Sequence, residues 1–380
     1  MKHLLLLLLL ASPAFGGIHR IADHGAIAND NKPDTQAFRN AFAAAMAECG
    51  GTVVVPRGEF LVDGTVAPNQ NEKGSCGSVP LSFVGEVGAV VRIAVGSDKT
   101  AFAFSWLQQV VQVRDLTFIG SEVTADHPQF VDAKTVFYFG TLPSATVSHC
   151  SFINLAVPQR GALLAFASGK YEIAHTHFQG STALYAADID EGGAFILGDN
   201  DGQGNAWNNI TVRKSTFSDY ANFQQRFLSK SHEMAGAFIR TKALQPQSGA
   251  AVVTGRLVVI DTFFDEGAHT AIYAKGTPSV DLQGVSVNVN NTLGATGVRL
   301  VDVGHAVVLQ NVGDWVTNHR PYLTTRNVKF VKVSGLDLRA NTAFWHNQGG
   351  TNMLIEYCET CAERTYRGRQ VPNEIIGTRR

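Results

Sequence analysis

The 380-residue chain has few charged residues and almost no excess of either sign. Asp, Glu, Lys and Arg make up 17% of it, and 31 basic residues against 32 acidic ones leave a formal net charge of -1. Proteins that bind nucleic acid through its phosphates carry an excess of basic over acidic residues. The composition therefore argues against a nucleic-acid partner, and so few charges fit a long, heavily buried stack of sheets.

The chain lacks a later apolar run of about 20 residues, the length that a membrane-spanning helix needs. The apolar run over residues 4–10 is too short to span a bilayer, follows Lys2, and precedes a small-x-small site at residues 14–16. This order predicts a secretory signal peptide over residues 1–16. We expect the mature protein, residues 17–380, to be secreted or periplasmic, with no membrane partner.

Cysteine is scarce, with five residues in the chain. Cys49 and Cys76 flank the first predicted strands, where they can bridge in an oxidising compartment. Cys358 and Cys361 have no second ligand pair nearby, which favours a short terminal disulfide over a metal site. Cys150 occupies the inward place of a repeat, and we predict a buried free thiol there.

A short pattern recurs eight times: two apolar residues separated by one, a gap of two, a small or apolar residue, and usually Phe two places later. The copies begin at Val111, Ala145, Tyr171, Ile210, Leu257, Val280, Val307 and Val331. In the degraded copy that begins at Val307, Asp314 takes the place of Phe. Alternation of this kind is strand spacing, and the two-residue gap indicates a bend. Internal repetition predicts a stacked array of short strands.

A second family of apolar strands lies between these repeats, at 136–139, 162–166, 194–197, 237–239, 271–273 and 298–301. Each rung of the array therefore has at least two strands, and we expect a short third one. The rungs are longest between Phe178 and Phe217, 39 residues apart, and between Phe217 and Phe264, 47 residues apart. Insertions in a repeat form loops, often on the binding face, so residues 179–263 are predicted to form the walls of a cleft.

An amphipathic helix is predicted over about residues 34–48, before the first rung. Its apolar positions recur at three- and four-residue spacing, and Asp34 is its expected N-cap. Cys49, Gly50 and Gly51 end it, because glycine accepts left-handed geometry. Such a helix would cover the otherwise open end of a strand stack.

The segments 23–26, 34–35, 50–53 and 56–60, taken with the Ala-rich helix, resemble the N-terminal signature of the pectate-lyase superfamily. Within it they are most similar to the rhamnogalacturonase/epimerase-like group. The resemblance implies an all-β, single-stranded right-handed parallel β-helix with an N-terminal capping α-helix. Its rungs would span about 52–357, with a tail over about 358–380. Hydrolases, lyases, epimerases and phage tailspikes share this fold, so it does not define the chemistry.

The long rungs carry polar residues whose order is similar to that of the polygalacturonase active site. Two acidic motifs lie closer together than in that family, and no glycines flank the histidine. The resemblance implies four catalytic and two substrate-binding residues: Asp188, Asp199, Asp201 and His232, and Arg240 and Lys242.

Aligning the second-family strands at Ala194, Ala237 and Ala271 places Asp199 beside Lys242. Lys275 then falls one residue earlier and is expected to face the opposite way. Trp207 and Tyr273 are candidate aromatic contacts for a sugar ring.

Simpler interpretations compete with these assignments. Asp199 and Asp201 could merely cap turns, because Asp side chains bond nearby backbone amides. His175 and His177 are spaced to face the same side of a strand; with no third ligand near them, an exposed strand face is favoured over a metal pair.

The leading functional hypothesis is an exported enzyme that hydrolyses glycosidic bonds in an acidic, uronate-containing polysaccharide through paired carboxylates. A lyase acting by β-elimination on the same substrate class is the first alternative, and only that chemistry would call for Ca²⁺; otherwise we expect no cofactor. A non-catalytic, tailspike-like glycan-binding solenoid is the second alternative. The expected oligomeric state is a monomer or a homotrimer.

Overall fold

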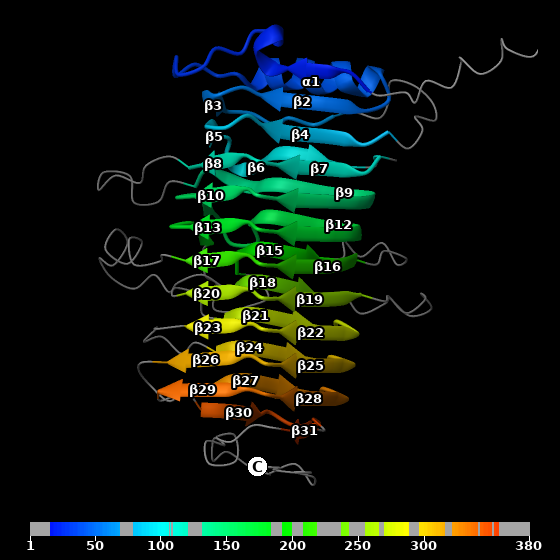
Figure 1. The fold of residues 1–380 in the computed structure, drawn as a ribbon, viewed down its shortest axis with the longest axis vertical. Helices are drawn as coiled ribbons and strands as arrows, with labels where there is room; N and C mark the ends of the chain where they lie inside the picture. Colours follow the sequence, from blue (N-terminus) through cyan, green and yellow to red (C-terminus); the bar gives the residue numbers. More distant parts are fainter. Residues whose placement is uncertain are drawn as a thin grey trace, which may run out of the picture.

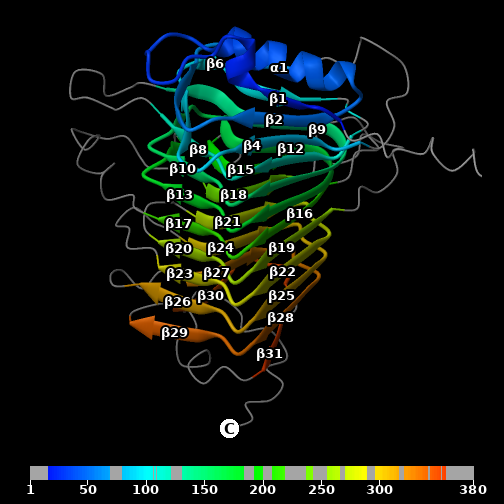
Figure 2. The ribbon, with the colours of Figure 1, turned by 45° about the horizontal axis from the view of Figure 1, so that its top comes forward.

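The computed structural model describes residues 16–68, 79–105, 107, 109–120, 131–183, 192–199, 208–218, 237–242, 255–265, 270–288, 296–315, 321–340, 343–351 and 353–356. This part of the chain forms a right-handed parallel β-helix whose rungs stack along one axis beneath helix α1 (Figures 1 and 2). Within the described residues, no helix is long and apolar enough to cross a membrane.

Three parallel ladders of strands form the walls of the column. The first ladder comprises β1 (Ile18–Arg20), β2 (Gly51–Val55), β4 (Leu81–Gly85), β7 (Val111–Arg114), β9 (Ala133–Ser148), β12 (Ala162–Ala174), β16 (Asn208–Arg213), β19 (Arg256–Ile260), β22 (Ser279–Gln283), β25 (His305–Leu309), β28 (Phe330–Ser334) and β31 (Met353–Glu356). The second comprises β3 (Gly58–Val62), β5 (Ala89–Ile93), β8 (Thr117–Ile119), β10 (Ser151–Ile153), β13 (His177–Gln179), β17 (Thr216–Ser218), β20 (Phe263–Asp265), β23 (Ser286–Asn288), β26 (Val312–Trp315) and β29 (Asp337–Ala340).

The third ladder corresponds to the second family of predicted strands. It comprises β6 (Gly96–Phe104), the first halves of β9 and β12, β15 (Ala194–Asp199), β18 (Ala237–Lys242), β21 (Thr270–Lys275), β24 (Thr296–Val301), β27 (Pro321–Arg326) and β30 (Ala343–Asn347). The long strands β9 and β12 run through both the first and third ladders and join them into one sheet. A short pair, β11 (Ala156–Val157) and β14 (Thr182–Ala183), lies beside the ladders.

The capping helix is present as predicted. The 3-10 helix η1 (Ile21–His24) precedes α1 (Thr35–Ala47), whose buried face includes Phe38 and Phe42. These two rings meet Phe83 edge-on, at centroid distances of 6.1 and 5.3 Å, so the helix closes the first rungs with apolar surface. Asp34 holds the N-cap position but its side chain does not cap the helix. Its carboxylate instead accepts hydrogen bonds from the backbone amides of Ile27 and Leu61, each at 3.0 Å, which ties the N-terminal segment to β3.

The repeat's Phe position forms a continuous stack inside the column. Successive rings lie 4.6 to 5.1 Å apart and within 22° of parallel, a geometry that joins neighbouring rungs through aromatic contact; the rings are Phe118, Phe152, Phe178, Phe217 and Phe264. All five side chains are fully buried. The recurring Phe of the repeat therefore faces the core in these five copies.

The copy assigned to Val307, Val312 and Asp314 was wrong by one residue. The backbone pairs Val287 with Gly313 rather than with Asp314, and the buried residues of this rung are Ala306, Val308, Asn311 and Gly313. The sequence pattern does not show which residues of this rung face inward, because apolar residues occupy both faces of β25.

Glycine is required at position 313 because a Cβ there would lie 2.7 Å from Cδ2 of Tyr322. The fully buried Tyr322 ring thus takes the space that Phe fills in other rungs. Its hydroxyl accepts a hydrogen bond from Asn311 Nδ2 at 3.0 Å.

The two-residue gap of the repeat is a bend, as predicted, between the first and second ladders. Its second residue has a positive φ in every rung from β7 to β28, held by Asp115, His149, His175, Lys214, Asp261, Gly284, Gln310 and Gly335. His175 and His177 both lie on the outer surface, on either side of the buried Thr176, but they belong to different elements. His175 lies in the bend with φ 50°, whereas His177 begins β13.

The buried free thiol is confirmed at Cys150. Burial raises the pKa of this thiol to about 12, and only a thiolate reacts fast with alkylating agents. Cys76, Cys358 and Cys361 lie outside the described residues, so both disulfides stay predictions.

We expect iodoacetamide to leave the Cys150 peptide unmodified in the native protein at neutral pH and to alkylate it fully in denaturant. Peptide mass spectrometry of both samples measures this. Rapid native alkylation at Cys150 would contradict the buried position.

Candidate functional site

Two rows of outward-facing residues run down the third ladder. One row pairs Leu197, Arg240, Tyr273, Arg299 and Thr324 across β15, β18, β21, β24 and β27. Ile239 and Ile272, each one residue before this row, belong to the core. Because successive strand residues face opposite sides, the row lies on the outer surface of the ladder.

The second row, two residues further along each strand, pairs Asp199 with Lys242, then Lys242 with Lys275, and ends at Val301 and Arg326. The two rows bring five basic residues and one tyrosine to four successive strands. We call this set the cationic face: Arg240, Lys242, Tyr273, Lys275, Arg299 and Arg326.

Arg240 and Tyr273 are nearly inaccessible although they face outward, with 3% and 2% of their surface exposed. Arg240 Nη1 donates a hydrogen bond to the carbonyl of Gly192. The Arg299 guanidinium carbon lies 5.6 Å from the centroid of the Tyr273 ring, a cation–π contact. Arg299 Nε is buried and has no hydrogen-bond partner among the described residues.

This arrangement suits carboxylate recognition. A guanidinium presents a planar fork that matches a carboxylate, and lysine adds a mobile point charge. Neighbouring strands are about 4.8 Å apart, so the cations follow one another at short intervals along the column. No group of three or more His, Cys, Asp or Glu side chains that could hold a metal ion occurs among the described residues.

The structure brings together three of the eight predicted site residues, Arg240, Lys242 and Tyr273. Asp199 pairs in register with Lys242, as the alignment predicted. Asp188, Asp201, Trp207 and His232 lie outside the described residues, as do most of the long loops between 179 and 263.

The expectation that Lys275 faces away from Lys242 was wrong. Thr270, not Ala271, pairs with Ala237, so Lys275 and Lys242 are register partners. Sequence reasoning also missed Arg299 and Arg326. The available signal for Arg299 was its position within an apolar strand of the same family, where a charged residue must face outward; the strand that ends at Arg326 was not predicted.

No protein-family model and no curated protein sequence matches the chain. Solved structures do match. The A-module of the mannuronan C-5 epimerase AlgE4 from Azotobacter vinelandii is 14% identical over 88% of this chain and 93% of its own, with a TM-score of 0.50. The surface protein and adhesin PfbA of Streptococcus pneumoniae is 14% identical over 89% and 93%, with a TM-score of 0.54.

Tailspike protein 2 of an Escherichia coli O157:H7 bacteriophage is 9% identical over 90% of this chain, with a TM-score of 0.52. The match covers 42% of the tailspike. These likenesses show the fold. At such identities they do not transfer an activity.

Proposed function

We propose that the protein is an exported enzyme that degrades an acidic, uronate-containing polysaccharide bound along the cationic face. The observation that carries this proposal is the run of basic residues on the outer surface of four successive strands, with Asp199 in register beside it. A sugar polymer with a carboxylate on each unit would meet a cation at each rung. Tyr273 lies between Arg240 and Arg299 in the same row.

Hydrolysis is the reaction we place first. It requires one carboxylic acid to protonate the leaving oxygen and a second carboxylate to activate water or attack the sugar. Asp199, at the edge of the cationic face, is the candidate for one of these roles. Asp188 and Asp201 are candidates for the other, with His232 as a supporting proton carrier.

β-Elimination is the second candidate, favoured by the excess of cations among the described residues of the face. A lyase neutralises the uronate carboxylate so that a base can remove the adjacent proton. Lys242 and Lys275, which are register partners, are the candidates for neutralising this carboxylate. One protein of similar fold is an epimerase of mannuronan, itself a uronate polymer, which agrees with the substrate class. Membership of the pectate-lyase superfamily belongs to this proposal.

A non-catalytic glycan-binding role is the remaining alternative, and the similar folds of an adhesin and a tailspike agree with it. An activity assay separates the three. Purified protein is incubated with polygalacturonate, rhamnogalacturonan and alginate. New reducing ends without the ultraviolet absorbance of an unsaturated uronate indicate hydrolysis, and reducing ends with it indicate elimination. Binding without either product on every glycan would reject an enzyme.

Lys242→Ala tests the substrate-binding role. Loss of a hydrogen-bonded ion pair to a substrate carboxylate costs about 1.5–3 kcal/mol, so we expect kcat/KM to fall by about 10- to 100-fold. Lys99→Ala is the matched control, since Lys99 is an exposed lysine of β6 on the same ladder. Melting temperatures should be equal in both variants. Equal activity in the two would remove Lys242 from the site.

A further inference from the structure

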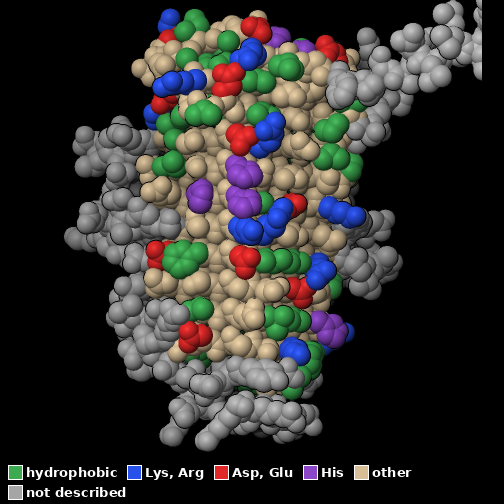
Figure 3. All heavy atoms as spheres, in the orientation of Figure 1, with side chains coloured by type: hydrophobic (Ala, Val, Ile, Leu, Met, Phe, Trp, Pro, Cys, Tyr) green, Lys and Arg blue, Asp and Glu red, His purple; other side chains and the backbone are tan. Residues whose placement is uncertain are grey.

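A second basic cluster lies where the first ladder bends into the second. His149, His175 and Lys214 hold the left-handed position of three successive bends. Arg213 precedes Lys214 at the end of β16, and His177 begins β13. We call these five residues the histidine corner. Figure 3 shows histidine side chains gathered near the middle of this face, with basic side chains next to them.

The corner concentrates positive charge over a short distance. The His149 and His175 rings stack 4.9 Å apart and within 6° of parallel. His177 Nδ1 lies 2.7 Å from the Thr216 hydroxyl. Partial desolvation, followed by the positive groups His149, Lys214, Arg213 and His177, lowers the pKa of His175.

The carboxylates around the corner lie to its side and at its ends. Glu172 of β12 pairs with Arg213. Asp115 and Asp261 hold the bend positions before His149 and after Lys214, and Arg114 pairs with Asp115 at 2.7 Å. The positive run is therefore limited to three rungs, about 10 Å at the strand spacing. A run this short does not match the extended phosphate backbone of a duplex.

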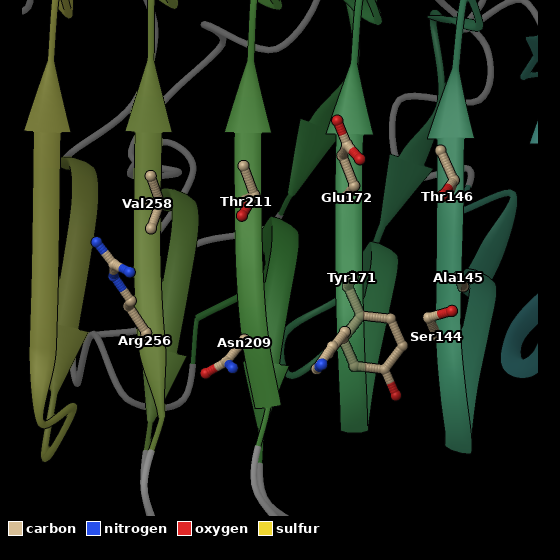
Figure 4. Close-up of a pocket in the computed structure, with 10 residues that line it drawn as sticks. Ser144, Ala145, Thr146, Tyr171, Glu172, Asn209, Thr211, Arg256 and Val258 are labelled. Carbon is tan, nitrogen blue, oxygen red and sulfur yellow. The ribbon is translucent and has the colours of Figure 1, made fainter.

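A depression of about 410 Å³ adjoins the corner on the outer surface of β9, β12, β16 and β19. Small hydroxyl and amide side chains contribute to its lining, namely Ser144, Thr146, Asn209 and Thr211. Lys170 and Glu172 of β12 pair in register with residues of β9 and β16 and so lie between these small side chains. Arg256 of β19 lies beside Asn209 (Figure 4). Glu172 connects the two features, because it lines the depression and pairs with Arg213 of the corner. Hydroxyl and amide groups are suitable partners for sugar hydroxyls.

We infer that the histidine corner and this depression form a second binding surface for an acidic polysaccharide, separate from the cationic face and strongest when the histidines are protonated. Sugar hydroxyls would bind in the depression and a neighbouring carboxylate at the corner. The surface lies on the first ladder, whereas the cationic face lies on the third. Glycan binding at this surface therefore does not depend on the catalytic activity proposed for the cationic face.

The pH dependence follows from the charge of the imidazoles. A protonated imidazole is cationic and attracts carboxylates, whereas a neutral one does not. Because desolvation and then the neighbouring positive groups lower the pKa of His175, this ring becomes cationic only below the usual histidine range. A bound anion favours the protonated form. Affinity therefore rises as the pH falls, until the uronates themselves are protonated.

The test measures polygalacturonate binding by isothermal titration calorimetry at about pH 5 and about pH 7.5, at low salt, with dextran as the neutral glycan. The double variant His149→Asn/His175→Asn removes the two stacked rings, and Asn tolerates the left-handed bend. Gln310→Asn is the control, because Gln310 holds the same bend position with φ 52°. Melting temperatures confirm that each variant folds.

The intact protein should bind polygalacturonate about 3- to 10-fold more tightly at the lower pH, as expected for a few exposed ion pairs. The double variant should lose this gain and keep its kcat, while Gln310→Asn should keep both. Three results would overturn the inference: an undiminished pH dependence in the double variant, equal binding of dextran, or equal binding of a short DNA duplex. The fall in kcat/KM in Lys242→Ala should leave the gain in binding at low pH in place, so a failure of this inference can be told apart from a failure of the proposed function.

Discussion

Asp199→Asn should lower kcat on a uronate polysaccharide by about 10²- to 10⁴-fold, the range that general acid–base catalysis contributes. Asp199 ends β15 and pairs in register with Lys242, so it is the carboxylate whose backbone position the structure links to the cationic face. Asn keeps the size of the side chain but can neither give up nor take a proton. Initial rates at saturating substrate measure the effect.

Asp98→Asn is the matched control for this variant. Asp98 is an exposed residue of β6, on the same ladder and three strand steps before β15. At about 4.8 Å a step the two strands are about 14 Å apart, and Asp98 lies near the start of its strand whereas Asp199 ends β15. We expect full activity in Asp98→Asn and unchanged melting temperatures in both. If Asp199→Asn keeps its kcat while Lys242→Ala loses activity, Asp199 has no role in proton transfer and another group carries it out. The interpretation of Asp199 as a turn-capping residue would then be favoured.

The sequence predicts the column better than it predicts its register. Apolar alternation and the recurring Phe define the inward face wherever the other face is polar, as from Phe118 to Phe264. The two errors of register, at Asp314 and at Lys275, share a cause. Both fall in strands with apolar or small residues on each face, where the hydrophobic pattern does not fix the facing. A slip of one residue then reverses every side chain.

The part of the candidate site that could be predicted from the sequence is the part in which two basic residues lie on the same strand. Arg240 and Lys242 lie two residues apart on one strand, which places them on one face whatever their neighbours do. Arg299 and Arg326 each stand alone in their strands, and only the pairing of distant strands brings them to the same face. The histidine corner was missed for a related reason. His149, His175 and Lys214 come together only through the pairing of successive rungs, which the spacing within one strand does not show.

Phe137→Ala should have the largest effect on stability, about 3–5 kcal/mol of the free energy of unfolding. The Phe137 ring is fully buried in β9. It lies between the stacked ring of Phe102, at 4.9 Å, and the edge-on ring of Phe118, also at 4.9 Å. Four more aromatic rings lie within 6.5 Å of it, those of Phe83, Phe104, Phe139 and Phe152.

Removal of this ring opens a cavity that the rigid rungs around it cannot close, because hydrogen-bonded strands fix the spacing of its neighbours. Thermal and urea unfolding followed by circular dichroism measure the loss. Phe263→Ala is the matched control, since Phe263 begins β20 with 37% of its surface exposed and surface changes stay within about 0.5 kcal/mol. Phe137→Leu should fall between them, because it refills most of the volume. Equal stability of the two alanine variants would show that the aromatic stack does not hold the upper rungs together.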